Sequence, residues 1–185
     1  MSTSLYLLAI MASLGAFDTI YFHESRAKLP LLPGAEAELA LHASRDFIYG
    51  ILFAALPLVA WCGLFAIVLG GLLLAEIVIT LADFVTEDRV RKALGGVYPG
   101  ERVTHAIMGL VYGAVLATIV PVIRRWSMMP TGLVVEPAAI PVALRYLMIL
   151  MAAGVSASGV RDLYAAMKLH QAGRRPVAIA ESFRA

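Results

Sequence analysis

The chain of 185 residues is far too apolar for a water-soluble domain. Its residues are 61% hydrophobic, its mean hydropathy is +0.83, and its charged residues lie in blocks between long uncharged runs. The net charge of +2 comes without a basic stripe interleaved with aromatic residues, which argues against a nucleic-acid partner. The composition therefore predicts an integral membrane protein.

The predicted helices follow from segment length, because a helix needs roughly 20 mostly apolar residues to cross a bilayer. Segments of this kind cover residues 5–22, 47–65, 66–84, 105–123 and 140–160. We expect an all-α integral membrane protein with five transmembrane helices, the first four forming an antiparallel bundle of two similar hairpins. The second and third spans follow each other directly, which predicts a tight helical hairpin around Gly63, Gly70 and Gly71.

Residues 1–168 are expected to form a single transmembrane domain, followed by a basic cytoplasmic tail over residues 169–185. With five spans, twelve of the fifteen Lys and Arg residues lie on the side of the C-terminus. Cytoplasmic loops carry an excess of Lys and Arg. This predicts a multi-pass protein of a bacterial-type cytoplasmic (inner) membrane, with its N-terminus outside and its C-terminus in the cytoplasm.

Acidic residues and three of the four histidines gather at the predicted cytoplasmic ends of the first four spans. Ionisable groups at or near a bilayer are costly unless they are paired, hydrated or bound to something, so such a cluster is a functional-site hypothesis. The four groups are Asp18, His23 and Glu24; Glu38, His42 and Asp46; Asp83, Glu87 and Asp88; and Glu101 and His105.

Helical spacing places several of these side chains on shared faces. Residues four apart share a face, which pairs Glu38 with His42, Asp83 with Glu87, and Glu101 with His105. Asp18 and His23 are five apart, about 140° around an ideal helix, so only one can point inward unless the helix unwinds. Glu24 can serve in place of His23.

The two predicted hairpins also resemble each other. Asp18 precedes His42 by 24 residues and Asp83 precedes His105 by 22, with a Glu four residues before each histidine. Parallel repeats of this kind are related by an axis along the membrane normal. Carboxylates and histidines from four helices are the ligand set of a dinuclear carboxylate centre, although the soluble version has Glu and His three apart, so the likeness is one of chemistry.

Oxygen and imidazole ligands suit iron, manganese or zinc. We predict a divalent metal centre, foremost of two iron ions, with manganese or zinc as the alternatives. A haem held by His42 and His105 is disfavoured by the dense carboxylates around them. The predicted metal ligands are Asp18, His23, Glu24, Glu38, His42, Asp83, Glu87, Glu101 and His105.

Three further residues are catalytic candidates. Asp46 is a spare carboxylate that can act as a general base. Tyr49 and Tyr112 lie seven residues after His42 and His105, on the same helix faces, and can line a substrate pocket or serve as redox-active phenols. The structural alternative is a belt or core position for both tyrosines.

Structural explanations also compete for the charged residues. The histidines can belong to a hydrogen-bonded network, and Glu24, Glu87 and Asp88 can be solvated. Glu76, near the middle of the third span, can pair with Arg145 or begin a polar route toward the cluster.

The leading hypothesis is an integral membrane metalloprotein with a cytoplasm-facing dinuclear centre, acting as an oxidoreductase on a membrane lipid or another lipophilic small molecule. The alternatives are a zinc-dependent lipid hydrolase, a divalent-cation or proton transporter, and a non-catalytic membrane subunit. Small residues on the fifth span would let it meet a second copy or a partner membrane subunit: Gly154, Ser156, Ser158 and Gly159.

Overall fold

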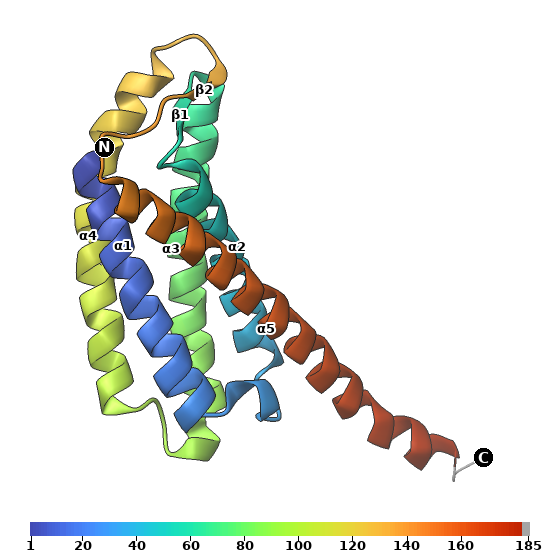
Figure 1. The fold of residues 1–185 in the computed structure, drawn as a ribbon. Helices are drawn as coiled ribbons and strands as arrows, with labels where there is room; N and C mark the ends of the chain where they lie inside the picture. Colours follow the sequence, from blue (N-terminus) through green and yellow to red (C-terminus); the bar gives the residue numbers. More distant parts are fainter. Residues whose placement is uncertain (183–185) are drawn as a thin grey trace.

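Five long helices make up almost all of the fold (Figure 1). The computed structural model describes residues 1–182, and side chains through residue 173. In chain order the elements are α1 (Ser2–Phe17), the π-helix η1 (Asp18–Arg26), the 3₁₀ turn η2 (Leu29–Leu31), α2 (Glu36–Ala55), β1 (Val59–Cys62), α3 (Leu64–Val90), the 3₁₀ turn η3 (Arg91–Leu94), α4 (Pro99–Ser127), β2 (Gly132–Val135) and α5 (Val142–Ser182).

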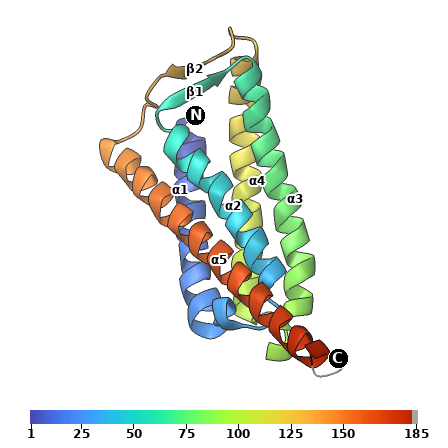
Figure 2. The same cartoon turned by 90° about the vertical axis from the view of Figure 1, so that its right-hand side faces the viewer.

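The helices pack in a ring. α1 packs against α4, α4 against α3, α3 against α2, and α2 against α5. α1 and α2 are not among the closely packed pairs, and α5 crosses the bundle at an angle beside them (Figure 2). The first four helices alternate in direction as expected, but the first hairpin is open and α5 completes the ring.

Four helical stretches are long and apolar enough to cross a membrane: Ser2–Arg26, Leu64–Leu94, Pro99–Ser127 and Val142–Gly173. Large apolar side chains cover their outer surfaces, for example Ile67, Leu110 and Leu150, each at least 66% exposed. Water-soluble monomers rarely expose contiguous apolar patches of this extent. The outer surface therefore fits a lipid environment, as the composition predicted.

The helix predicted over residues 47–65 is wrong in its extent. α2 is shifted toward the N-terminus and ends at Ala55, and residues 59–62 form β1 instead of continuing the helix. α2 is also not among the four stretches that meet the length and hydropathy needed to cross a membrane, because its first half carries charged residues. The predicted second span is thus absent as a helix of that range.

The expected helical hairpin around Gly63, Gly70 and Gly71 is also wrong. β1 pairs antiparallel with β2, from Val59 opposite Val135 to Cys62 opposite Gly132, and only then does α3 begin. Gly63 caps α3 with a φ of 61°, and a Cβ there would meet Thr131. Only glycine adopts this conformation without strain at such a close approach.

Small residues of α5 pack inward against α2. An ideal Cβ on Gly159 would lie 3.0 Å from the Cβ of Asp46, and Ser156 lies against Gly50 in the same way. Two of the residues proposed for a partner surface are therefore used within the chain. A second copy or partner subunit on α5 stays a prediction.

The two ends of the bundle differ in character. The sheet and the N-terminus lie at one end, and the α1–α2 and α3–α4 connections lie at the other (Figure 1). An apolar core, including Leu52, Leu69 and Ile119, fills the space between them. All four predicted polar clusters belong to the end that carries the connections.

Candidate metal centre

The polar end of the bundle holds a buried network of acidic, basic and imidazole side chains. Contacts of 3.6 Å or less and one ring stacking connect eight of the nine predicted ligands. Asp18 and Asp83 are 1% exposed, and Glu38 and Glu101 are fully buried. Side chains from all four predicted clusters therefore meet at this end of the bundle.

The π-helix η1 explains how both Asp18 and His23 join the network. A π-helix forms hydrogen bonds from residue i to i+5, so residues five apart come onto one face. His23 Nε2 accordingly lies 3.3 Å from Asp18 Oδ2. The helix is therefore wider at the position where Asp18 and His23 could otherwise not both point inward. His23 joins the network itself, and Glu24 does not take its place.

The histidines and aspartates of the two hairpins pair reciprocally. Asp18 of the first hairpin contacts His105 of the second, with 3.1 Å between Oδ2 and Nε2. Asp83 of the second contacts His42 of the first, also with 3.1 Å between Oδ2 and Nε2. This exchange is what a two-fold axis between parallel repeats produces, and it supports the duplication inferred from spacing.

Two overlapping groups of side chains have the geometry to hold a metal ion. Asp18, His23 and His105 form one, and Glu87, Glu101 and His105 form the other, with the ligand atoms of each group within 4.8 Å of one another. Two ligands of one ion each lie about 2.0–2.2 Å from it, so these separations are close to what a metal needs. His105 belongs to both groups.

Glu38 is neutralised by Arg91 rather than free to bind a metal. The guanidinium of Arg91 donates from Nη2 to Glu38 Oε1 at 2.7 Å and from Nε at 3.0 Å, and both side chains are fully buried. Arg91 Nη2 also lies 3.2 Å from Glu101 Oε1. Arg91 therefore holds the carboxylates of α2 and α4 beside each other.

His42 and Asp83 form the inner edge of the network. Arg45 Nη1 lies 3.3 Å from Asp83 Oδ2, the oxygen that also faces His42. The ring of His42 stacks on that of His23, with centroids 4.5 Å apart and 8° between the planes. In this arrangement His42 and Asp83 support the ligand group that contains His23.

The charge of the network favours a cation. Its five carboxylates outnumber its two guanidiniums, so with neutral imidazoles the network carries three net negative charges. Protons on all three imidazole rings or added cations would offset them. Buried carboxylates are costly unless compensated in this way. The network contains two guanidiniums, Arg45 and Arg91, three imidazoles, and the five carboxylates of Asp18, Glu38, Asp83, Glu87 and Glu101.

Most buried side-chain N and O atoms that lack a hydrogen-bond partner in the described part of the chain belong to this network. His23 Nε2 lies 3.2 Å from Glu101 Oε1 and 3.3 Å from Asp18 Oδ2, without the geometry of a hydrogen bond to either. Buried polar groups in native proteins are normally satisfied by protein, water or an ion. The residues present therefore fit a bound metal.

The remaining predicted site residues lie outside the two ligand groups. Glu24 pairs with Arg161 at 2.9 Å, and Asp46 lines a groove beside α5. Tyr49 donates a hydrogen bond to Glu76 Oε1 at 2.9 Å, and Tyr112 donates to the Leu73 carbonyl oxygen at 3.0 Å. Both phenols are buried, and each lines a cavity.

The expected pair of Glu76 with Arg145 does not form. Glu76 accepts hydrogen bonds from Tyr49 and Thr80. Arg145 donates instead to the Ala138 carbonyl oxygen, in the segment just before α5. Its side chain is used near the sheet end of the bundle, because α5 starts there and not beside the middle of α3.

Sequence reasoning missed the roles of Arg91 and Arg45. Asp83, Glu87 and Arg91 follow one another at intervals of four, which places the arginine on the acidic face. Arg45 is three residues after His42 and shares its face for the same reason. This spacing is the signal that identifies both as members of the site.

Comparison of the chain with protein families, curated proteins and solved structures finds no match. The fold and the site define the class: an all-helical protein with four helices apolar enough to cross a membrane, and groups of buried Asp, Glu and His that could hold a metal.

Proposed function

We propose that this is an integral membrane metalloprotein whose cytoplasmic end binds two divalent metal ions and acts as an oxidoreductase on a lipophilic substrate. The observation that carries the proposal is the pair of ligand groups sharing His105. Each group combines carboxylate and imidazole donors, which iron and manganese accept. Two iron or manganese ions held there would cycle together between the trivalent and divalent states and so supply a two-electron oxidation, with dioxygen as the external oxidant that restores the trivalent pair.

The surroundings support the same reading. The ligands are buried between helices whose outer faces are apolar, so the substrate that reaches them most directly is one dissolved in the membrane. Arg91 and Arg45 fix the flanking carboxylates from outside the ligand groups. Supporting partners of this kind orient the ligands of a metal centre.

The test is the metal content of the detergent-purified protein, measured by mass spectrometry after non-chelating preparation. We expect about two equivalents of iron or manganese in the wild type. His105→Ala should lose both ions, since it contributes to both groups. His42→Ala, which removes a supporting side chain, should weaken metal affinity about 10–100-fold.

The matched control is His170→Ala, because His170 is exposed on α5 and outside the network. It should keep the full metal content. A metal-free wild type would refute the proposal, and zinc alone would replace redox chemistry by hydrolysis.

One observation favours a second candidate, a divalent-cation or proton transporter. A cavity of about 190 Å³ is lined by Glu76, Thr80, Arg45 and His105, so polar groups extend from the middle of α3 to the centre. In a transporter, Glu76→Gln would abolish cation or proton flux in proteoliposomes while leaving the metal content of the purified protein unchanged. In an oxidoreductase no such flux is observed.

A further inference from the structure

A groove of about 590 Å³ opens beside the candidate metal centre, between α1, α2 and α5. It exists because α1 and α2 do not pack closely and α5 crosses over the gap between them. Its volume lies in the range of about 300–1,000 Å³ that is usual for small-molecule sites.

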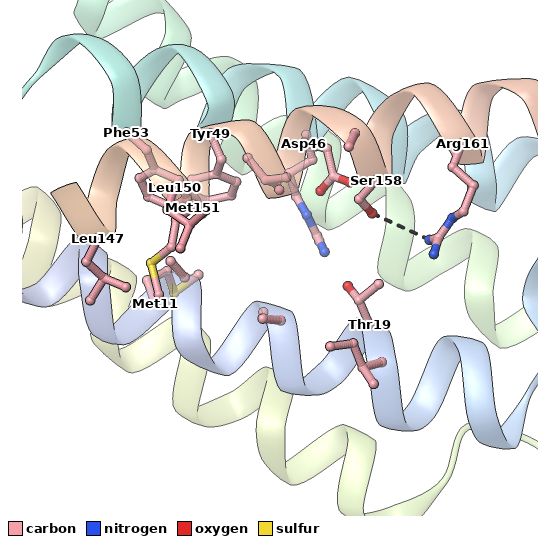
Figure 3. A pocket seen from close by; sticks show the side chains of 18 of the residues that line it. Met11, Thr19, Asp46, Tyr49, Phe53, Leu147, Leu150, Met151, Ser158 and Arg161 are labelled. Carbon is pink, nitrogen blue, oxygen red and sulfur yellow. Dashed lines mark hydrogen bonds between the residues drawn. The ribbon is translucent and has the colours of Figure 1, made fainter.

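The groove is apolar at one end and polar at the other (Figure 3). Met11, Phe53, Leu147, Leu150 and Met151 lie at the apolar end. Small residues also line the groove and keep it wide: Gly15, Gly154 and Ala157. A linear hydrocarbon or isoprenoid chain fits such a surface.

Asp46, Ser158 and Arg161 lie at the polar end. Arg45, which precedes Asp46 in α2, also lines the groove. Both guanidiniums already have carboxylate partners: Arg45 contacts Asp83 at 3.3 Å, and Arg161 contacts Asp162 at 2.7 Å and Glu24 at 2.9 Å.

Asp46 makes no ion pair among the residues that the structure describes. An anionic head group would lie beside this carboxylate and find no uncompensated cation. A hydroxyl group instead can donate to Asp46 and accept from a guanidinium.

We propose that the groove binds a single-chain lipophile with an uncharged, hydroxyl-bearing head group, and that this is the substrate class of the proposed metal centre. That the bound molecule is a substrate rests on the proposed function. Its binding in the groove does not require the metal. Long-chain alcohols and quinols share this chemistry.

Arg45 connects the groove to the centre. Together with Met11 and Met108 it lines both the groove and the cavity of about 190 Å³ that contains His105. The same guanidinium contacts Asp83. A head group bound at Arg45 and Asp46 therefore lies next to the side chains of the metal network.

The experiment measures equilibrium binding of radiolabelled oleyl alcohol to the purified full-length protein in detergent. Gly154→Phe should block the groove and weaken binding at least tenfold. The matched control is Gly113→Phe on α4, since both glycines are exposed and helical, neither has a neighbour within 4 Å of an ideal Cβ, and Gly113 is outside the groove. The control should bind like the wild type.

Three further probes define the head group. Oleate, at alkaline pH where its carboxyl group is ionised, should bind at least tenfold more weakly than the alcohol, and Asp46→Asn should reduce that preference. A decyl benzoquinol should compete with the alcohol, and the tighter of the two identifies the source of the hydroxyl. Equal binding to both phenylalanine variants, or tighter binding of oleate, would overturn the inference.

His105→Ala separates this inference from the proposed function. If the variant loses its metal but binds oleyl alcohol like the wild type, the groove is established independently of the centre. If the wild type holds no metal but still binds the alcohol in the groove, the proposed function fails and the binding site stands.

Discussion

Arg91 is the single residue on which the burial of the acidic cluster most depends. It is 0% exposed, lies at the end of α3, and compensates Glu38 and Glu101 at once. Without it, two fully buried carboxylates would face each other across the bundle. Its position four residues after Glu87 makes it part of the same helix face as the candidate ligands.

Replacing Arg91 by alanine should therefore be strongly destabilising. Breaking a buried ion pair by removing one partner costs about 3–5 kcal/mol, because the remaining charge is left uncompensated. The measurement is the thermal unfolding midpoint of the detergent-purified variant. Arg89→Ala is the control, since Arg89 is exposed and, among the side chains described through residue 173, its one side-chain hydrogen bond is to the Val85 carbonyl oxygen of its own helix. Equal midpoints for the two variants would contradict the role assigned to Arg91.

At the scale of the element, η1 is the part of the fold that most directly shapes the candidate centre. Its π-helical hydrogen bonding brings Asp18 and His23 onto one face although they are five residues apart. The wide turn thus accommodates one residue more than an α-helical turn. The other pairs of network residues on a shared face are four residues apart and need only regular α-helix.

A deletion and an insertion in η1 should have opposite effects on metal binding. Deleting the exposed Ile20 should return the segment to α-helix with Asp18 and His23 four positions apart, still on one face, and the metal should be retained. Inserting one alanine after Ile20 places them six apart and should abolish metal binding by the group that contains His23.

Both variants are compared by metal content, with the thermal midpoint as a check of folding. Loss of metal in the deletion variant together with retention in the insertion variant would show that the π-helix does not set this geometry.

At the scale of the whole molecule, the polar end of the bundle coincides with the end that the Lys and Arg count assigns to the cytoplasm. Residues 23–35, the connection from α3 to α4, and the C-terminal half of α5 all lie at that end (Figure 1). The sheet of β1 and β2 lies at the opposite end. Labelling one residue at each end of the bundle therefore determines which end faces the cytoplasm.

We expect a cysteine in place of Ser25 to be shielded in intact bacteria and a cysteine in place of Ser127 to be labelled. Both serines are exposed, and they lie at opposite ends of the bundle. The background is Cys62→Ala, since Cys62 is the single cysteine of the chain. A membrane-impermeant maleimide should modify Ser25→Cys only after lysis. The reverse pattern would place the candidate metal centre on the outer side.

The sequence by itself predicted the four helices that are long and apolar enough to cross a membrane, and the meeting of four polar clusters at one end, whereas its second predicted span was wrong in extent. Both follow from information along the chain, namely the lengths of apolar runs and the positions at which ionisable residues interrupt them. Spacing of four residues also identified three pairs of network residues that share a helix face, of which Glu101 and His105 lie in one candidate ligand group.

Only the tertiary structure decided which carboxylates are free to bind a metal and which are compensated. Glu38 is paired because α3 brings Arg91 across to it, and Glu24 because α5 brings Arg161. The strand at Val59–Cys62 likewise depends on pairing with β2, whose residues lie 70 to 76 positions further along the chain. The groove depends on the angle at which α5 crosses α1 and α2, and contacts between elements distant in sequence leave no trace in local periodicity.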